Sequence, residues 1–126
     1  MEQVSDADFN APVPGQQSAA APSGPTRAQQ LVGDVAPKLA ELTDQVLFGD
    51  VWVRPQLGRR DRSLVTVSAL IAMNRPDQLR SHLALAKQNG VIEEELVEAI
   101  THLAFYTGWP NAMSAAGIAK EVFQKQ

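Results

Sequence analysis

Residues 61–76 of the chain read DRSLVTVSALIAMNRP, and this stretch decides the fold class. Apolar residues occupy most positions from Leu64 to Met73, without the strict alternation of a half-buried strand. The β-branched residues make a strand the competing interpretation, but the length of the stretch favours a helix. Because a helix that is apolar on most faces is normally buried, we predict a central helix that Asp61 caps and Asn74 ends.

Helix start and stop signals recur on both sides of this stretch. Prolines and acidic residues are favoured in the first turn of a helix, and glycine or asparagine just after its end. The expected starts and stops are, in chain order, Pro37 and Gly49, Pro76 and Asn89-Gly90, Glu93–Glu95 and Gly108, and Pro110. The first of these helices carries apolar residues at helical spacing, namely Leu39, Leu42, Val46 and Leu47. We therefore predict an all-α protein, a compact bundle of about six helices.

Composition excludes several classes of function. The chain has 126 residues, no cysteine and a formal net charge of −3. Without cysteine, disulfide scaffolds, thiolate metal sites and thiol catalysis are excluded. The negative charge argues against nucleic acid as a partner, and no apolar run approaches the ~20 residues of a membrane span. Since Met1–Asp6 has neither the basic start nor the apolar core of a secretory signal, we expect a cytoplasmic protein without a membrane partner.

The composition changes near residue 28. Residues 1–27 are rich in proline and alanine and cannot offset their own ordering entropy by burial. We interpret them as an N-terminal leader, or as an arm that lies on a neighbouring subunit with Phe9 and Val13 as anchors. Residues 28–126 are expected to form the helical domain.

The chain contains two histidines. His82 follows Leu79 by three residues, so it borders an apolar stripe, and His102 shares a helix face with Tyr106 and Trp109. A single helical histidine is more often a packing residue than a catalyst. The two histidines lack a second ligand at metal-binding spacing, so we predict no metal site.

Six of the eleven basic residues are arginines within one 27-residue window. They are Arg54, Arg59, Arg60, Arg62, Arg75 and Arg80. The simpler interpretation is a solvated loop and helix start, above all where Asp61 separates two of them. The functional interpretation is a cationic pocket for a small anion, because guanidinium groups bind carboxylates bidentately. Arg75 and Arg80 bracket His82, an arrangement suited to holding and protonating an anionic substrate.

Three aromatic residues could line such a pocket. Tyr106 and Trp109 lie near a helix junction at Gly108-Trp109-Pro110, and Trp52 precedes the arginine window. Core or subunit packing is the more common role of such residues. A wall for a flat, unsaturated ring is the alternative, for which Trp109 is the better candidate.

Five sequence blocks resemble the carboxymuconolactone decarboxylase family. They are Phe48–Leu57, Arg60–Val67, Leu79–Ala86, Asn89–Val91 and Ala104–Ala112. Within residues 48–120 they follow the family's order. The alkylhydroperoxidase-like branch uses a Cys-x-x-Cys-x-x-x-His core and an upstream glutamate. Here its histidine falls on His82, its cysteines on Arg75 and Gln78, and its glutamate near Ser63. Without thiols, peroxidase chemistry is excluded, so the chain resembles the decarboxylase branch.

The resemblance implies a fold and a reaction. The fold would be alkylhydroperoxidase-like, with subunits assembled as a homotrimer or homohexamer. The reaction would be cofactor-free decarboxylation of a small carboxylated lactone, 4-carboxymuconolactone, to the β-ketoadipate enol-lactone of aromatic catabolism. Two alternatives stay open: a different small ring acid as substrate, and a non-catalytic oligomeric ligand-binding or scaffold protein.

Nine residues are candidates for the site of that reaction. His82, Arg75 and Arg80 are the candidates for catalysis. The candidates for substrate binding are Arg54, Ser63, Gln78, Trp52, Tyr106 and Trp109. His82 would deliver the proton, and arginines would hold the charged groups of the small anionic substrate. We expect no metal and no organic cofactor, because the ring itself accepts the electrons.

Overall fold

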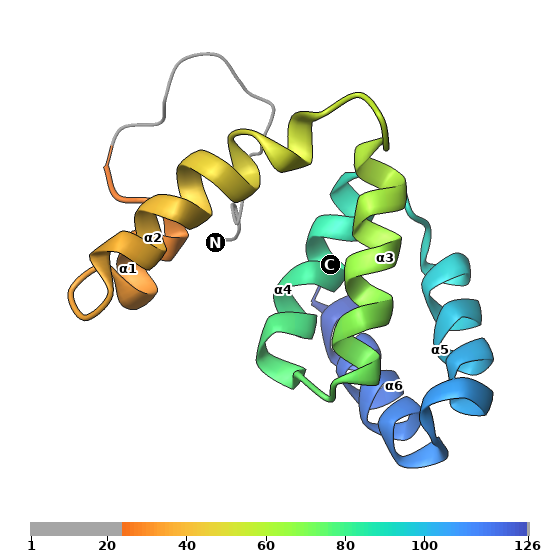
Figure 1. Cartoon of the computed structure of the whole chain (residues 1–126). Coiled ribbons are helices and arrows are strands. Elements are labelled where there is room, and N and C mark those ends of the chain that lie inside the picture. Colours follow the sequence, from red (N-terminus) through yellow and green to blue (C-terminus); the bar gives the residue numbers. More distant parts are fainter. Residues whose placement is uncertain (1–23, 126) are drawn as a thin grey trace. The chain divides into compact units, whose positions relative to one another are not determined.

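The computed structural model describes residues 24–125 of the chain, and within this range every regular element is a helix (Figure 1). The α-helices are α1 Arg27–Val32, α2 Pro37–Leu42, α3 Arg59–Ala72, α4 Pro76–Gln88, α5 Glu93–Thr107 and α6 Trp109–Gln124. A π-helical segment, η1 (Thr43–Phe48), and a 3-10 turn, η2 (Val51–Val53), follow α2. The prediction of an all-α chain with about six helices is confirmed. The proposed anchors Phe9 and Val13 lie outside the described residues, and the boundary at residue 28 stays a prediction.

The chain divides into two units, one up to Arg59 and one from Arg60, which we describe separately. In the first unit, Thr26 caps α1 through a reciprocal pair of hydrogen bonds with Gln29. Pro37 stands at the start of α2, and η1 prolongs that helix to Gly49, so both predicted ends are confirmed. The hydroxyl of Thr26 donates a 2.6 Å hydrogen bond to the Asp44 carboxylate, which ties the start of α1 to η1.

The apolar stripe of the first unit faces outward in the single chain. Leu39, Leu42, Val46 and Leu47 are all exposed, and so are Leu31 and Val35. In contrast, Trp52 on η2 is buried, with its ring centroid 5.6 Å from that of Phe48. The spacing of these apolar residues therefore predicted the helix correctly. The residues themselves, however, are not buried within the first unit.

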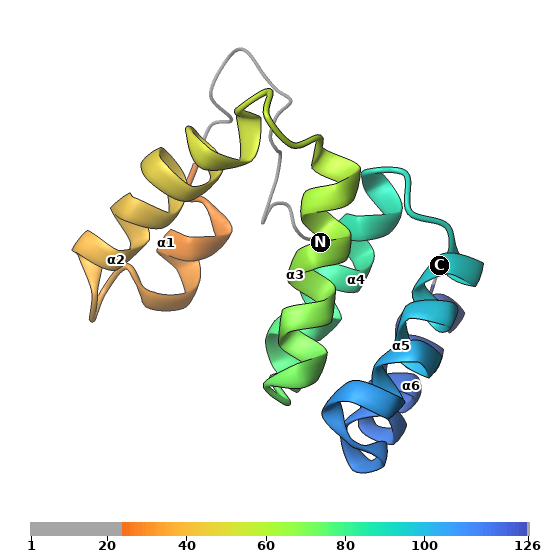
Figure 2. The same cartoon turned by 45° about the vertical axis from the view of Figure 1, so that its right-hand side comes forward.

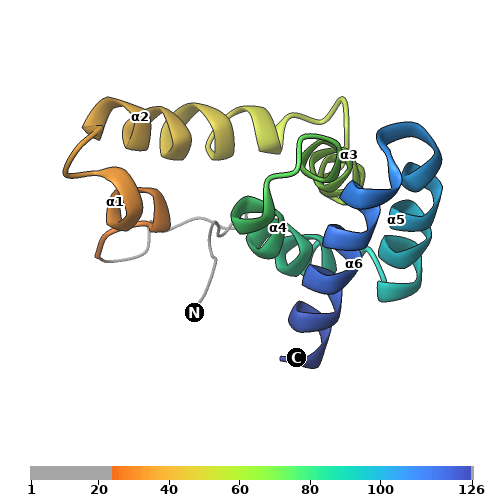
Figure 3. The ribbon, with the colours of Figure 1, turned by 90° about the horizontal axis from the view of Figure 1, so that it is seen from below.

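The second unit consists of two helical hairpins, α3–α4 and α5–α6 (Figure 2). Each helix contributes one buried stripe to a shared core. The core residues are Val67 and Ile71 of α3, Leu79, Leu83 and Ala86 of α4, Leu96, Ile100 and Ala104 of α5, and Ala112, Ala115, Ile118, Ala119 and Val122 of α6, with Val91 between α4 and α5. The small residues of α6 allow close approach of its neighbours. Seen from below, α4 and α5 lie on opposite sides of α6 (Figure 3).

The three helix stops predicted in the second unit, Asn74, Asn89-Gly90 and Gly108, are confirmed, and the first two share one type of backbone ending. Asn74 adopts the left-handed conformation (φ 54°), and the next amide, of Arg75, donates a 3.0 Å hydrogen bond to the Leu70 carbonyl. Gly90 (φ 100°) precedes an equivalent 2.9 Å bond from the Val91 amide to the Ala86 carbonyl. These are Schellman endings, which satisfy carbonyls at a helix C-terminus.

Two expectations for α3 were wrong. This helix begins at Arg59, so Asp61 lies in its first turn and is not its N-cap. A carboxylate in the first turn still interacts favourably with the helix dipole. The helix is also not buried on most faces: only Ser63, Val67 and Ile71 are buried, and Val65 is 62% exposed. One side of α3 packs on the core and the other stays on the surface of the single chain.

Candidate functional site

His82 is a buried polar residue on α4, with 8% of its surface exposed. It lies next to Leu83 and three residues after Leu79, both of which belong to the core, and its Nδ1 atom is buried. The expectation that His82 borders an apolar stripe is therefore confirmed. A histidine that is shielded from bulk water in this way is suited to moving one proton to or from a bound ligand.

The structure does not place Arg80 with His82. Two residues apart on one helix, their side chains leave α4 in different directions. The Nε atom of Arg80 donates a 2.8 Å hydrogen bond to Glu121 on α6, and Nη1 lies 3.2 Å from Asp77. The hydrogen bond to Glu121 raises the pKa of Arg80, and the same bond lowers the pKa of Glu121. The catalytic role of Arg80 stays a prediction, but two carboxylates already hold its guanidinium.

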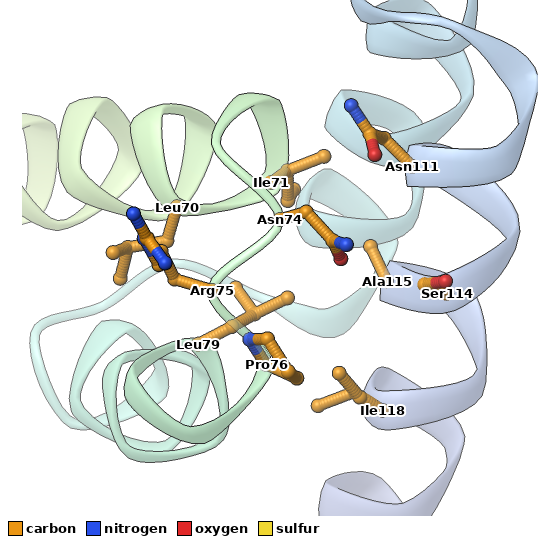
Figure 4. A pocket seen from close by; sticks show the side chains of 10 residues that line it. All are labelled: Leu70, Ile71, Asn74, Arg75, Pro76, Leu79, Asn111, Ser114, Ala115 and Ile118. Carbon is orange, nitrogen blue, oxygen red and sulfur yellow. The ribbon is translucent and has the colours of Figure 1, made fainter.

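Arg75 lies at the rim of a shallow hollow in the second unit (Figure 4). The hollow is a surface depression that encloses no space large enough for a water molecule. Its other polar lining residues are Asn74, Asn111 and Ser114, and its apolar lining includes Leu79 and Ile118. Arg75 is the N-cap residue of α4, seven residues before His82, so the two are roughly 10 Å apart along the helix axis. His82 does not line the hollow.

Asn111, on α6, links α3 to α5 next to the hollow. Its Nδ2 atom donates hydrogen bonds to the carbonyls of Ala72, at 3.2 Å, and Thr107, at 3.0 Å. The end of α3 is thereby joined to the junction between α5 and α6. No local sequence pattern marks this pair, because Ala72 is 39 residues away from Asn111.

Ser63 is fully buried near the start of α3, at the end of the α3–α4 hairpin opposite to the turn at Asn74. Its hydroxyl oxygen accepts a 2.9 Å hydrogen bond from the side-chain amide of Asn89, the C-cap residue of α4. The contact between Ser63 and the substrate stays a prediction. In the single chain, Ser63 is the hydrogen-bond partner of Asn89, a contact that the sequence did not indicate.

Tyr106 and Trp109 belong to an exposed aromatic patch, which we define as Phe105, Tyr106, Trp109 and Met113. Phe105 and Tyr106 are each 75% exposed, and Phe105 packs edge-on against Trp109 with ring centroids 5.3 Å apart. The rings of His102 and Tyr106 are in contact, with centroids 4.9 Å apart, so the predicted common face of these two residues is confirmed. Trp109 begins α6, so the prediction that it shares this helix face is wrong. The patch lies on α5 and the first turns of α6, whereas His82 lies on α4. Phe105 lies on α5 and Met113 on α6, with the break at Gly108 between them, so no spacing along a single helix marks the patch in the sequence.

The other predicted ligand contacts lie elsewhere. Gln78 is exposed on α4. Trp52 and Arg54 belong to the first unit. Trp52 lies in η2, and Arg54, which is exposed, follows the end of η2. Their roles in substrate binding stay predictions. Among residues 24–125 there is no group of three or more side chains that could hold a metal ion, and none of the helices described is long and apolar enough to cross a membrane.

The described residues thus form a helical protein with a buried histidine on α4, and the chain has no thiol. Comparison with known proteins makes this specific. The carboxymuconolactone decarboxylase family matches residues 37–121, and the chain belongs to this family. It is 39% identical over 98 residues to a 4-carboxymuconolactone decarboxylase of Acinetobacter baylyi, covering 78% of this chain and 73% of the relative. It is 40% identical over 75 residues to a nitrosuccinic acid decarboxylase of Metarhizium robertsii, covering 60% of this chain and about half (52%) of that relative.

Proposed function

We propose that this protein is a carboxy-lyase that decarboxylates 4-carboxymuconolactone to the β-ketoadipate enol-lactone. The observation that carries the proposal is the 39% identity to a protein named for this activity, over most of both chains. The buried His82 on α4 supports it, because the reaction needs a protein acid that is shielded from water.

The chemistry defines what the residues must do. Loss of carbon dioxide sends its bonding electrons through the ring alkene to the lactone carbonyl oxygen, which becomes negatively charged. A positively charged side chain near that oxygen stabilises the transition state. His82 then protonates the ring carbon next to the carbonyl, which yields the enol-lactone. The ring accepts the electrons, so this route uses no metal ion or organic cofactor.

A related acid is the second candidate substrate. The nitrosuccinic acid decarboxylase, at 40% identity, is named for an acyclic acid with an electron-withdrawing nitro group. Decarboxylation next to such a group again needs a site for developing negative charge and an acid for the carbon. The site described for this chain therefore also supports a different small acid as substrate.

The direct experiment is to incubate the purified protein with 4-carboxymuconolactone and to measure carbon dioxide and enol-lactone. We expect stoichiometric formation of both, faster than in buffer alone. Nitrosuccinic acid in a parallel reaction separates the two candidate substrates. If neither acid reacts at high protein concentration, the non-catalytic ligand-binding interpretation replaces the proposal.

We further propose that the protein self-associates, as a homotrimer or homohexamer, in the cytoplasm. The aromatic patch supports self-association, since exposed aromatic residues at the surface are typical of interfaces. The sequence from Ala99 to Ala119, which contains the patch, has no charged side chain. Two copies of this surface can therefore meet without like-charge repulsion, although the whole chain is negative.

A further inference from the structure

We infer that Asn89-Gly90 is a deamidation site, at which the side-chain amide of Asn89 is converted to a carboxylate, and that the hydrogen bond from Asn89 to Ser63 slows this conversion. This covalent modification of the chain is independent of the proposed function. Three features point to it: the glycine that follows Asn89, the open space beside that glycine, and the hydrogen bonds that hold both reacting groups.

The reaction joins two groups that are neighbours along the chain. The backbone nitrogen of Gly90 attacks the Cγ atom of Asn89, a bond forms between these two atoms, and the bond from Cγ to Nδ2 breaks. Nδ2 leaves as ammonia together with the proton of the Gly90 amide, and a five-membered succinimide ring remains. Water then opens the ring at either of its two carbonyls, which gives aspartate or isoaspartate. Water is the only other reactant, and no atom is oxidised or reduced.

The residue after the asparagine favours this reaction. Gly90 has no Cβ atom to hinder the approach of its nitrogen, and it is exposed just beyond the end of α4. A carbon atom added at its Cβ position would meet no neighbouring atom within 4 Å, so the ring has room to form. The other asparagines of residues 24–125, Asn74 and Asn111, precede residues with a side chain that hinders the same attack. Asn89 should therefore react before these two.

In the folded chain, hydrogen bonds hold both reacting groups. Nδ2 of Asn89, the leaving group, donates a 2.9 Å hydrogen bond to the hydroxyl of Ser63, which has no exposed surface. The backbone N–H of Gly90, the attacking group, donates a 3.1 Å hydrogen bond to the Lys87 carbonyl. Both bonds must break before the nitrogen can reach Cγ, so the reaction requires opening of the end of α4. The bond to Ser63 is the one that a side-chain substitution can remove.

The product would weaken the same end of α4. A carboxylate in place of the Asn89 amide lies beside the last carbonyls of the helix, where the helix dipole disfavours negative charge. Lys87, the basic residue of the last turn, is already paired with Glu93. Isoaspartate also lengthens the backbone by one carbon atom, where the Val91 amide donates to the Ala86 carbonyl. Deamidation is therefore expected to loosen the connection between α4 and α5.

The test is storage of the purified full chain at mildly alkaline pH, followed by proteolysis and mass spectrometry of the asparagine-containing peptides. We expect conversion of Asn89 before conversion of Asn74 or Asn111. Ser63→Ala should speed the conversion of Asn89 about fivefold or more, the factor that corresponds to the loss of one hydrogen bond. Ile71→Val is the matched control, because it removes one methyl group from the core and lowers overall stability, but leaves the bond between Asn89 and Ser63 in place.

Earliest conversion at Asn89, accelerated by Ser63→Ala but not by Ile71→Val, supports the inference. Earlier conversion of either other described asparagine overturns it, and so does an equal rate in Ser63→Ala and the unaltered protein. Equal acceleration by both variants overturns it as well, because overall unfolding then controls the reaction. No conversion at Asn89 in Ser63→Ala, under conditions that convert a peptide of residues 84–95, also overturns it. If Ser63→Ala does not fold, Ser63→Cys takes its place, since a thiol is a weak acceptor of similar size.

Discussion

The amide of Asn89 donates a 2.9 Å hydrogen bond to the hydroxyl of Ser63, across the open end of the α3–α4 hairpin. Ser63 has no exposed surface, and the half-buried amide of Asn89 sits at the C-cap of α4. The pair joins the start of α3 to the end of α4, at the end of the hairpin opposite to the Asn74 turn. Ser63 is thus part of an interhelical contact in this chain.

We predict that Ser63→Ala destabilises the protein by about 1–3 kcal/mol, because the amide of Asn89 loses its acceptor in a partly buried position. Urea denaturation measures the change. Ser68→Ala, on the same helix and half-exposed, is the control and should change stability by less than about 0.5 kcal/mol. If Ser63→Ala lowers the decarboxylation rate but not stability, Ser63 contacts the substrate as the sequence analysis proposed.

The interhelical ion pair between Arg80 and Glu121 predicts a pH-dependent stability. Hydrogen bonding to Arg80 lowers the pKa of Glu121 in the folded protein. Its contribution to stability is therefore complete above the pKa of an unfolded glutamate, about 4.3, and is lost as the pH falls through the lower folded pKa. Glu121→Gln should be less stable than the unaltered protein at pH 7, and the difference should shrink toward pH 3.

Urea denaturation at the two pH values measures this effect. Glu94→Gln is the matched control, since Glu94 is exposed in the first turn of α5 and has no ion-pair partner among the residues described. A difference for Glu121→Gln that persists unchanged at pH 3 would show that its cause is packing and not charge.

The catalytic prediction concerns His82. We expect His82→Gln to lower turnover of 4-carboxymuconolactone by ~10²–10⁴-fold, the usual effect of removing a positioned acid. Glutamine is chosen because His82 is largely buried, and a polar side chain of similar size limits the loss of packing. Circular dichroism should show an unchanged helix content.

His102→Gln is the control for this experiment. His102 is exposed and stacks on Tyr106, on the side of the second unit that carries the aromatic patch. We expect nearly normal turnover for this variant. If the two results are exchanged, the proton donor is His102 and the assignment of the two histidines is reversed.

The local features of the fold could be predicted from the sequence. Pro37, Asn74 and Pro76 mark helix ends because their backbone preferences act within a few residues, and the structure confirms all three. Exposure could not be predicted in the same way. The apolar run from Leu64 to Met73 indicated a buried helix, yet α3 buries one stripe, since burial depends on which neighbours cover each face.

The candidate site shows the same limit. His82 was singled out correctly as a residue beside an apolar stripe, from spacing alone. The partner of Arg80, however, is Glu121, 41 residues along the chain on another helix, and its identity depends on how α4 and α6 pack. Proximity in sequence suggested that Arg80 and Arg75 act together on His82, whereas Arg80 pairs with Glu121 and Arg75, before the start of α4, lines a hollow that His82 does not line.

The last prediction concerns the aromatic patch. Replacing Phe105 and Trp109 together by serine should reduce the mass of the assembly measured by light scattering at micromolar concentration. An aromatic side chain buries 150–250 Å² at an interface, so the double change removes the largest apolar contacts that this surface offers. Both residues are exposed in the single chain, so the folded unit should keep its stability. Val65→Ser, at a 62% exposed apolar position on α3, is the control for loss of surface hydrophobicity in general. An unchanged mass for Phe105→Ser/Trp109→Ser, or an equal loss for Val65→Ser, would place the contact between subunits on another face.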